Sequence, residues 1–112
     1  MASEEKNSVV ENVKILAGID DNLQDEVIET LEEMTRNQLA MLVDENSVPP
    51  KLEPIVQHVT LSRFNRLGNE GYSSYSQEGE SISYPSSDFD EYKATISRYL
   101  AERQRGRILM WD

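Results

Sequence analysis

The chain has 112 residues, of which 38% are hydrophobic, and it carries a formal net charge of −10 at pH 7. This size is typical of one domain with a modest core, and the deficit of Lys and Arg argues against a protein that reads DNA. No cysteine and a single histidine, His58, exclude a disulfide framework and a thiolate or histidine-cluster metal site, so we expect no metal and no cofactor.

A first short helix is predicted after a polar N-terminal stretch. Ser8 and Glu11 have the spacing of a capping box, and Gly18 is a typical helix end. The apolar face of this helix is Val9, Val13 and Leu16. At about ten residues such a helix is marginal alone, so it must dock on the rest of the domain.

A second helix is predicted from about Leu23 to Val43, capped by the acidic turn at residues 20–22. Its apolar residues fall into two patches, Leu23, Val27, Ile28, Leu31 and Met34, and then Leu39, Leu42 and Val43. The polar turn 35–38 separates them. Either the two halves meet different partners, or this is one curved core helix with a single polar turn.

A third helix is predicted to begin near Lys51 or Leu52, because Pro54 is tolerated only in a first turn. Its buried stripe is Leu52, Ile55, Val56, Val59 and Leu67, with Phe64 on a flanking face. We expect Gly68 to end this helix as a C-cap with positive φ. His58 is interpreted as structural or surface-exposed, and not as a ligand or a catalytic group.

A long loop, residues 68–86, follows and is predicted to be a contact loop. About eighteen residues without a helix is longer than compact domains usually carry without a purpose. The alternation of polar and apolar residues from Ser81 to Tyr84 suits a short strand.

A fourth helix is predicted after Pro85, with Ser87 as its cap. Its apolar stripe is Phe89, Tyr92, Ile96, Tyr99 and Leu100. The pattern is lost at 103–106, and the chain is predicted to close with an apolar C-terminal tail, residues 104–112, in which Gly106 would be a hinge. This tail either folds back on its own core or docks on another molecule, and we favour the partner. The predicted fold is all-α, a small four-helix bundle-like domain with a long loop that could hold a short β segment.

The run from Phe64 to Tyr84, FNRLGNEGYSSYSQEGESISY, lies between two of these helices. This run, the small size and the order of helices resemble the head-tail connector family of tailed bacteriophages, also called adaptor or head-completion proteins. The resemblance implies a small α-helical subunit that forms a ring under the portal of the capsid, through which DNA leaves the head. It further implies a copy number matched to the portal.

The leading hypothesis is therefore a structural connector, not an enzyme, because no phosphate loop and no nucleophile with a neighbouring base is present. Its expected partners are other copies in a homo-oligomeric ring, the portal protein and the next head-tail joining or tail-completion protein, with DNA only in passage. It would be located in the virion and, during assembly, in the host cytoplasm; no apolar run is long enough to span a membrane. The residues expected to make contacts are Gly68, Asn69, Glu70, Gly71, Tyr72, Tyr75, Ile82, Tyr84, Arg105, Arg107, Ile108, Leu109 and Trp111.

The charge distribution leaves an alternative open. Residues 1–50 hold 12 acidic against 3 basic residues, whereas residues 51–112 hold 9 against 8. An acidic half and a basic tail could attract each other between copies, and an acidic lining would suit a DNA conduit. A solvated acidic surface that keeps the protein soluble explains the same charge. The alternative function is a small acidic helical protein-protein interaction module or regulator.

Overall fold

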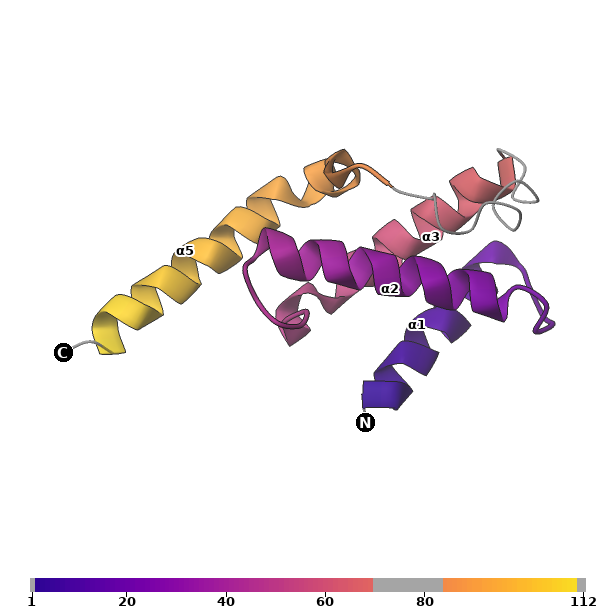
Figure 1. The fold of residues 1–112 in the computed structure, drawn as a ribbon, viewed down its shortest axis with the longest axis horizontal. Helices are drawn as coiled ribbons and strands as arrows, with labels where there is room; N and C mark the ends of the chain where they lie inside the picture. Colours follow the sequence, from indigo (N-terminus) through magenta and orange to yellow (C-terminus); the bar gives the residue numbers. More distant parts are fainter. Residues whose placement is uncertain (1, 70–83, 111–112) are drawn as a thin grey trace.

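The structure, a computed structural model, describes residues 2–69 and 84–110, with side chains described for 9–67 and 84–105. The described elements are the helices α1 (Ala2–Ala17), α2 (Asp25–Leu42), η1 (Pro50–Leu52), α3 (Glu53–Asn69), η3 (Ser86–Tyr92) and α5 (Lys93–Met110), of which η1 and η3 are 3₁₀ helices (Figure 1). The predicted all-α class is confirmed. The strand suggested at 81–84 lies, except for Tyr84, outside the described residues. Within the described residues, no helix has the length and apolar character needed to cross a bilayer.

Gly18 ends α1 as predicted. It has a φ of 76°, its N–H donates to the carbonyl of Ile15 at 3.2 Å, and the N–H of Ile19 donates to the carbonyl of Lys14 at 2.8 Å. These two hydrogen bonds form a Schellman motif, whose left-handed residue is usually glycine because glycine has no Cβ to clash. The motif turns the chain sharply towards α2.

Asp44 closes α2 in the same way without being a glycine. Its φ is 57°, its N–H donates to the carbonyl of Met41 at 3.2 Å, and the N–H of Glu45 donates to that of Ala40 at 2.9 Å. Asp tolerates the left-handed region better than most residues, but at a cost that glycine would avoid. This strained position lies directly before the connector to α3.

The predicted starts of three helices are wrong. α1 begins before Ser8, so the capping box predicted there lies inside the helix. α2 begins at Asp25 and not Leu23, because the side chain of Asp21 accepts the N–H of Leu23 at 3.1 Å and holds it in the preceding turn. η3 includes Ser87 and continues into α5, so Ser87 is not its cap. Each predicted cap was a residue type that is common at helix starts, which by itself does not fix where a helix begins.

Two glycines predicted to interrupt the chain instead lie within helices. α3 continues through Gly68 to Asn69, and α5 continues through Gly106 to Met110. A glycine inside a helix costs only about 1 kcal/mol relative to Ala, so helix-forming neighbours can carry the helix past it. The predicted hinge at Gly106 is therefore wrong, and most of the predicted tail is the end of α5. Pro54 lies in the first turn of α3, as expected.

The core consists of two apolar clusters that α2 joins. One lies between α1, the first half of α2 and α3; its buried members are Val9, Val10, Val13 and Ile28, and Leu61 and Phe64 of α3 pack against them. The other lies between the second half of α2, η1, α3, η3 and α5, and its buried members are Leu39, Val43, Leu52, Ile55, Val56, Val59, Phe89 and Ile96. The first apolar patch of α2 thus meets α1, the second meets η1, η3 and α5, and α3 packs against both. Leu16 and Leu23, predicted to face the core, are 59% and 83% exposed.

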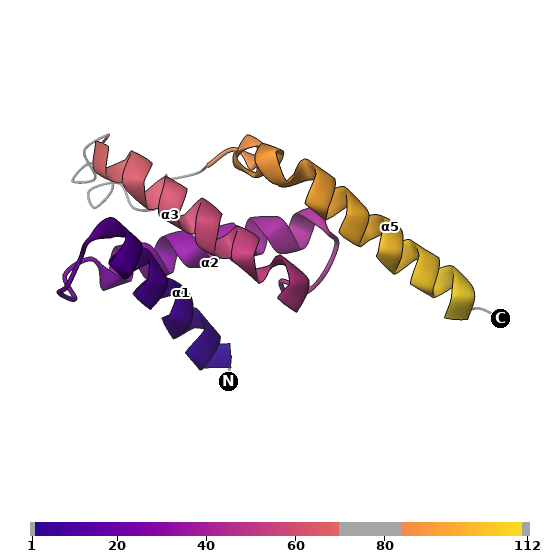
Figure 2. The same cartoon turned by 180° about the vertical axis from the view of Figure 1, so that it is seen from behind.

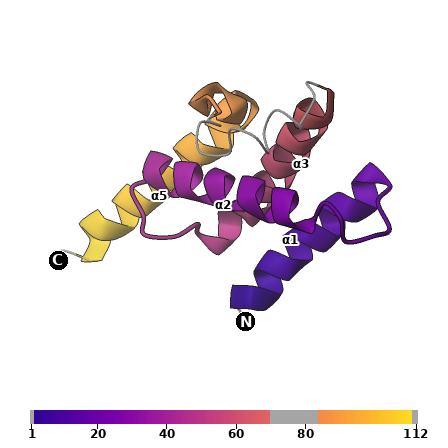
Figure 3. The same cartoon turned by 45° about the vertical axis from the view of Figure 1, so that its right-hand side comes forward.

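The molecule is elongated, with extents of 54 × 27 × 22 Å. Figures 1 and 2 show α1, α2 and α3 packed as a body, while α5 runs beyond it and carries the C-terminus to one end of the long axis. The turn between α1 and α2 lies at the other end. Figure 3 shows α2 spanning the distance from α1 to α5.

Candidate functional site

Arg63 of α3 is the centre of a buried polar cluster. Its side chain is 0% exposed, and its Nε donates to Asp88 Oδ2 at 2.8 Å. Its Nη groups donate to Gln38 Oε1 at 2.6 Å, Thr35 Oγ1 at 3.1 Å and the carbonyl of Pro85 at 3.3 Å. A buried guanidinium is tolerated only when its N–H groups and charge are matched in this way. Thr35 and Gln38 of the polar turn of α2 therefore face Arg63.

Arg66, one turn further along α3, binds the same carboxylate. Its Nη2 and Nη1 donate to Asp88 Oδ2 at 2.7 Å and Oδ1 at 3.2 Å. Burial favours the neutral form of Asp88, but the hydrogen bonds and charges of Arg66 and Arg63 outweigh it and lower the pKa of Asp88. Asp88 is thus held as an anion between two cations.

Tyr84 packs on the same arginines. The guanidinium carbons of Arg63 and Arg66 lie 4.8 Å and 5.1 Å from the centre of its ring, within cation-π range. The side-chain amide of Gln38 donates to the carbonyl of Tyr84 at 2.7 Å. Phe89 also packs on Arg63, with its ring centre 5.4 Å from the guanidinium carbon. Tyr84 is the first described residue after 70–83, and these contacts hold it against α2 and α3.

The other side of the polar turn of α2 holds a second ion cluster. Arg36 donates from Nε to Glu32 at 2.8 Å, and from Nη1 and Nη2 to the two oxygens of Glu53 at 2.7 Å and 2.9 Å. The hydrogen bonds of Glu53, the strongest influence, raise the pKa of Arg36 further above its ordinary value. This bidentate pair joins the middle of α2 to the first turn of α3. Together the two clusters fix α3 against α2 in its first turn and in its second half.

The outer half of α5 is attached through the connector after α2. Tyr99 Oη donates to Glu45 Oε2 at 3.0 Å, and Arg103 lies 3.2 Å from the same carboxylate and donates to the carbonyl of Val43. The end of α5 projects from the body (Figures 1 and 2). Arg105 is exposed on this projecting part.

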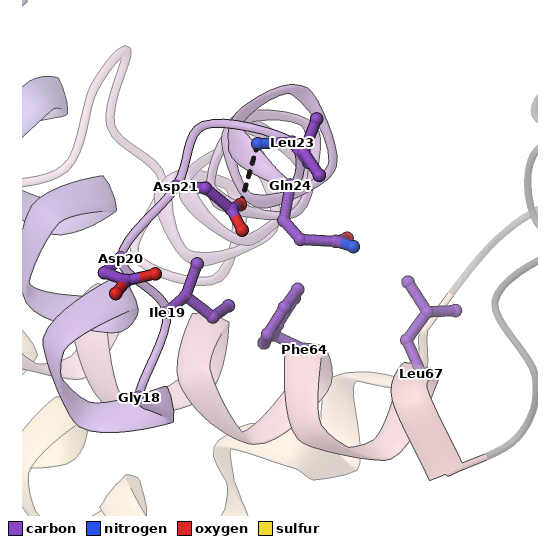
Figure 4. Close-up of a pocket in the computed structure, with 8 residues that line it drawn as sticks. All are labelled: Gly18, Ile19, Asp20, Asp21, Leu23, Gln24, Phe64 and Leu67. Carbon is purple, nitrogen blue, oxygen red and sulfur yellow. Dashed lines mark hydrogen bonds between the residues drawn. The ribbon is translucent and has the colours of Figure 1, made fainter.

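A hollow lies at the opposite end of the molecule, between the turn after α1 and the last turns of α3. It measures about 410 Å³ and is lined by Gly18, Ile19, Asp20, Asp21, Leu23, Gln24, Phe64 and Leu67. Figure 4 shows Ile19, Phe64 and Leu67 directed into it, with Leu23 and Gln24 above and Asp20 and Asp21 along its edge. Sequence reasoning did not find this hollow, because it assigned Leu23 to the core. No sequence signal indicated it, because only the structure shows that Leu23 is exposed.

Comparison with known families decides what kind of protein carries these features. The family model described as phage gp6-like head-tail connector protein matches residues 7–99. The chain belongs to this family. No curated protein and no solved structure matches the chain.

Membership in the head-tail connector family confirms the resemblance seen in the sequence. The matched range includes α1, α2, α3, η3 and the first part of α5, and thus both core clusters and the Arg63 cluster. The family is a structural one, whose members connect the heads and tails of phage particles. Membership in this family implies a location in the virion.

The residues expected to make contacts divide into three groups. Gly68 and Asn69 form the end of α3, and Tyr84 is part-buried against Arg63 and Arg66. Glu70, Gly71, Tyr72, Tyr75, Ile82 and Trp111 lie outside the described residues. Arg105, Arg107, Ile108 and Leu109 belong to the projecting part of α5, where the side chains of the last three are not described.

His58 agrees with its interpretation as a surface residue. It is exposed, and its Nδ1 is hydrogen-bonded to the hydroxyl of Tyr92, with the two rings tilted at 55°. Among residues 2–69 and 84–110, no group of His, Cys, Asp and Glu is arranged to hold a metal ion.

Proposed function

We propose that this chain is the repeating subunit of a ring that lies below the phage portal, joins the capsid to the tail and forms part of the DNA exit channel. The family match over residues 7–99 carries this proposal. Its partners would be other copies of the chain, the portal protein and the next head-tail joining or tail-completion protein. It would assemble in the cytoplasm of the bacterial host and act without catalysis or a cofactor.

The polar cluster around Arg63 supports a contact role for residues 70–83. Arg63 and Arg66 lie before this segment, and Tyr84 and Asp88 lie after it, yet all four are in contact. Both ends of the segment are therefore held at one place on the surface of α3. A segment anchored in this way would present Tyr72, Tyr75 and Ile82 to a neighbour while the body stays rigid.

The exposed acids of α2 support a position beside the DNA. Glu26, Glu29 and Glu33 are exposed and spaced at three and four residues, so they lie on one face of the helix. A negative wall repels the phosphates of passing DNA and would not retain it. In an assembled ring, these carboxylates should face the channel, and a map that places them all on the outer rim would contradict this part of the proposal.

Sedimentation of the chain alone and with its portal tests the proposed function. We expect a large complex that contains both proteins, and electron microscopy should show a ring added below the portal. A matched control is the portal with an unrelated acidic helical protein of similar size. A chain that stays small and never sediments with the portal would overturn the proposal.

The same acidic face favours a second candidate, a helical interaction module that binds a basic protein. Such a module would stay a monomer or dimer, and its affinity for a basic partner would fall steeply with added salt. The sedimentation experiment separates the two candidates.

A further inference from the structure

The hollow beside Leu23 has the character of a docking site. Leu23 is 83% exposed, which is unusual for a large aliphatic side chain, and Phe64 and Leu67 provide an apolar floor (Figure 4). At about 410 Å³, the hollow is within the size range of pockets that bind small molecules and is large enough for an aromatic side chain. Asp20 and Asp21 are exposed at its edge and give it a negative rim.

The end of α5 has the complementary composition. Arg105 and Arg107 precede the apolar run Ile108-Leu109-Met110-Trp111. A basic collar followed by apolar residues matches an apolar hollow with an acidic rim. The described part of α5 carries this sequence away from the body that holds the rest of the chain (Figures 1 and 2).

The end of α5 cannot reach the hollow of its own chain. The end of α5 and the turn that lines the hollow lie at opposite ends of a molecule 54 Å long (Figure 1). Even fully extended, residues 106–112 would span only about 25 Å. The occupant, if it is this segment, must come from another copy.

We infer that residues 108–111 of one copy dock in the hollow beside Leu23 of the next copy. This contact joins two different surfaces, head to tail, and repeating it generates a ring when the rotation between copies closes. The inference deepens the proposed function and rests on it for the ring, since the contact names the surfaces by which adjacent subunits join.

Cross-linking in the full chain tests this contact, because the protein has no natural cysteine. One variant carries Leu23→Cys and another Trp111→Cys, and the two are mixed and oxidised. The matched control replaces Leu23→Cys by Met41→Cys, since Met41 is 80% exposed but lies at the other end of α2. We expect at least about five times more covalent heterodimer with Leu23→Cys than with Met41→Cys. Equal yields, or no heterodimer, would overturn the inference.

A charge exchange provides a second readout. Reversing the rim with Asp20→Lys and Asp21→Lys should weaken self-association about tenfold or more, and adding Arg105→Glu and Arg107→Glu should restore most of it. Glu33→Lys, on the exposed face of α2, is the control and should change association much less. Loss of association without restoration would contradict the pairing of these two surfaces.

The other occupant to consider is residues 70–83, which follow α3. A double variant with Leu23→Cys and Ile82→Cys that closes efficiently within one chain would place this segment in the hollow and overturn the inference. The outcomes separate the two proposals. If rings form on the portal but the Leu23–Trp111 cross-link does not form, the proposed function stands and the inferred contact is wrong. If the cross-link forms but the chain does not bind the portal, the contact stands and the proposed function is wrong.

Discussion

Arg63 and Asp88 are 25 positions apart in the chain, and their side chains meet at 2.8 Å in the interior of the subunit. The contact joins the residues before and after the segment 70–83, and Arg66 strengthens it by binding the same carboxylate. Because Arg63 also binds Thr35 and Gln38, the ion pair connects α2, α3 and η3 at one point. We therefore regard this cluster as the element that positions the proposed contact arm.

Replacing Arg63→Ala should destabilise the subunit by about 3 kcal/mol or more. The change leaves the side chains of Asp88, Thr35 and Gln38 without their shared donor, and breaking a buried pair from one side typically costs 3–5 kcal/mol. Urea denaturation measures the loss. Arg98→Ala, on the exposed face of α5, is the control and should stay within about 0.5 kcal/mol of the native chain. A similar stability for both variants would show that the buried cluster does not hold the fold.

The contribution of Asp88 to stability should depend on pH. Its pKa is lowered in the folded chain from an ordinary value of 3.8, so the unfolded chain binds more protons in the interval between the two pKa values. The contribution is therefore fully present above about pH 5 and is lost as the pH falls through the folded pKa. The difference in free energy of unfolding between the native chain and Asp88→Asn should be constant near neutral pH and narrow below about pH 4.

Asp90→Asn is the matched control for this experiment, since the Asp90 carboxylate is 58% exposed and lies 3.9 Å from Lys93. Its effect on stability should be small at every pH. A difference for Asp88→Asn that stays the same from pH 7 to pH 3 would argue against the ion pairs described for Asp88.

Asp44→Gly should stabilise the subunit by about 0.5–1 kcal/mol. Asp44 has a φ of 57° at the end of α2, where glycine has no Cβ penalty. Thermal unfolding measures the gain. Asp44→Ala removes the same charge but keeps the Cβ, so it should not stabilise. If both variants raise the melting temperature equally, charge and not backbone strain accounts for the effect.

Glu45→Ala should loosen α5 without unfolding the body. Glu45 accepts from Tyr99 and lies 3.2 Å from Arg103, and both residues are on α5. The carboxylate is about one-third exposed, so we expect a loss of only about 1 kcal/mol. Amide hydrogen exchange should become faster in α5 and stay unchanged in α1. Glu29→Ala, an exposed acid of α2, is the control, and unchanged exchange in α5 of the Glu45 variant would contradict this attachment.

The polar turn of α2 illustrates the limit of prediction from the sequence. Thr35 and Gln38 interrupt an apolar pattern, and the pattern alone left open whether the helix meets two partners or only curves. Their role becomes visible once Arg63 is placed against them, and Arg63 is 28 and 25 positions away. Likewise Leu23 fits the apolar period of α2, but the bond from its N–H to Asp21 keeps it before the helix and leaves it exposed.

The sequence by itself determined the all-α class, the order of the helices, the apolar stripe of α3 and α5 and the end of α1 at Gly18, because these follow from periodicity and from the conformational preferences of single residues. Its resemblance to head-tail connectors also indicated the family. Only the tertiary structure decided that Arg63 is buried, that α5 projects from the body and that a hollow lies at the opposite end. These features depend on contacts between residues distant in the chain, whose free energies no local pattern encodes.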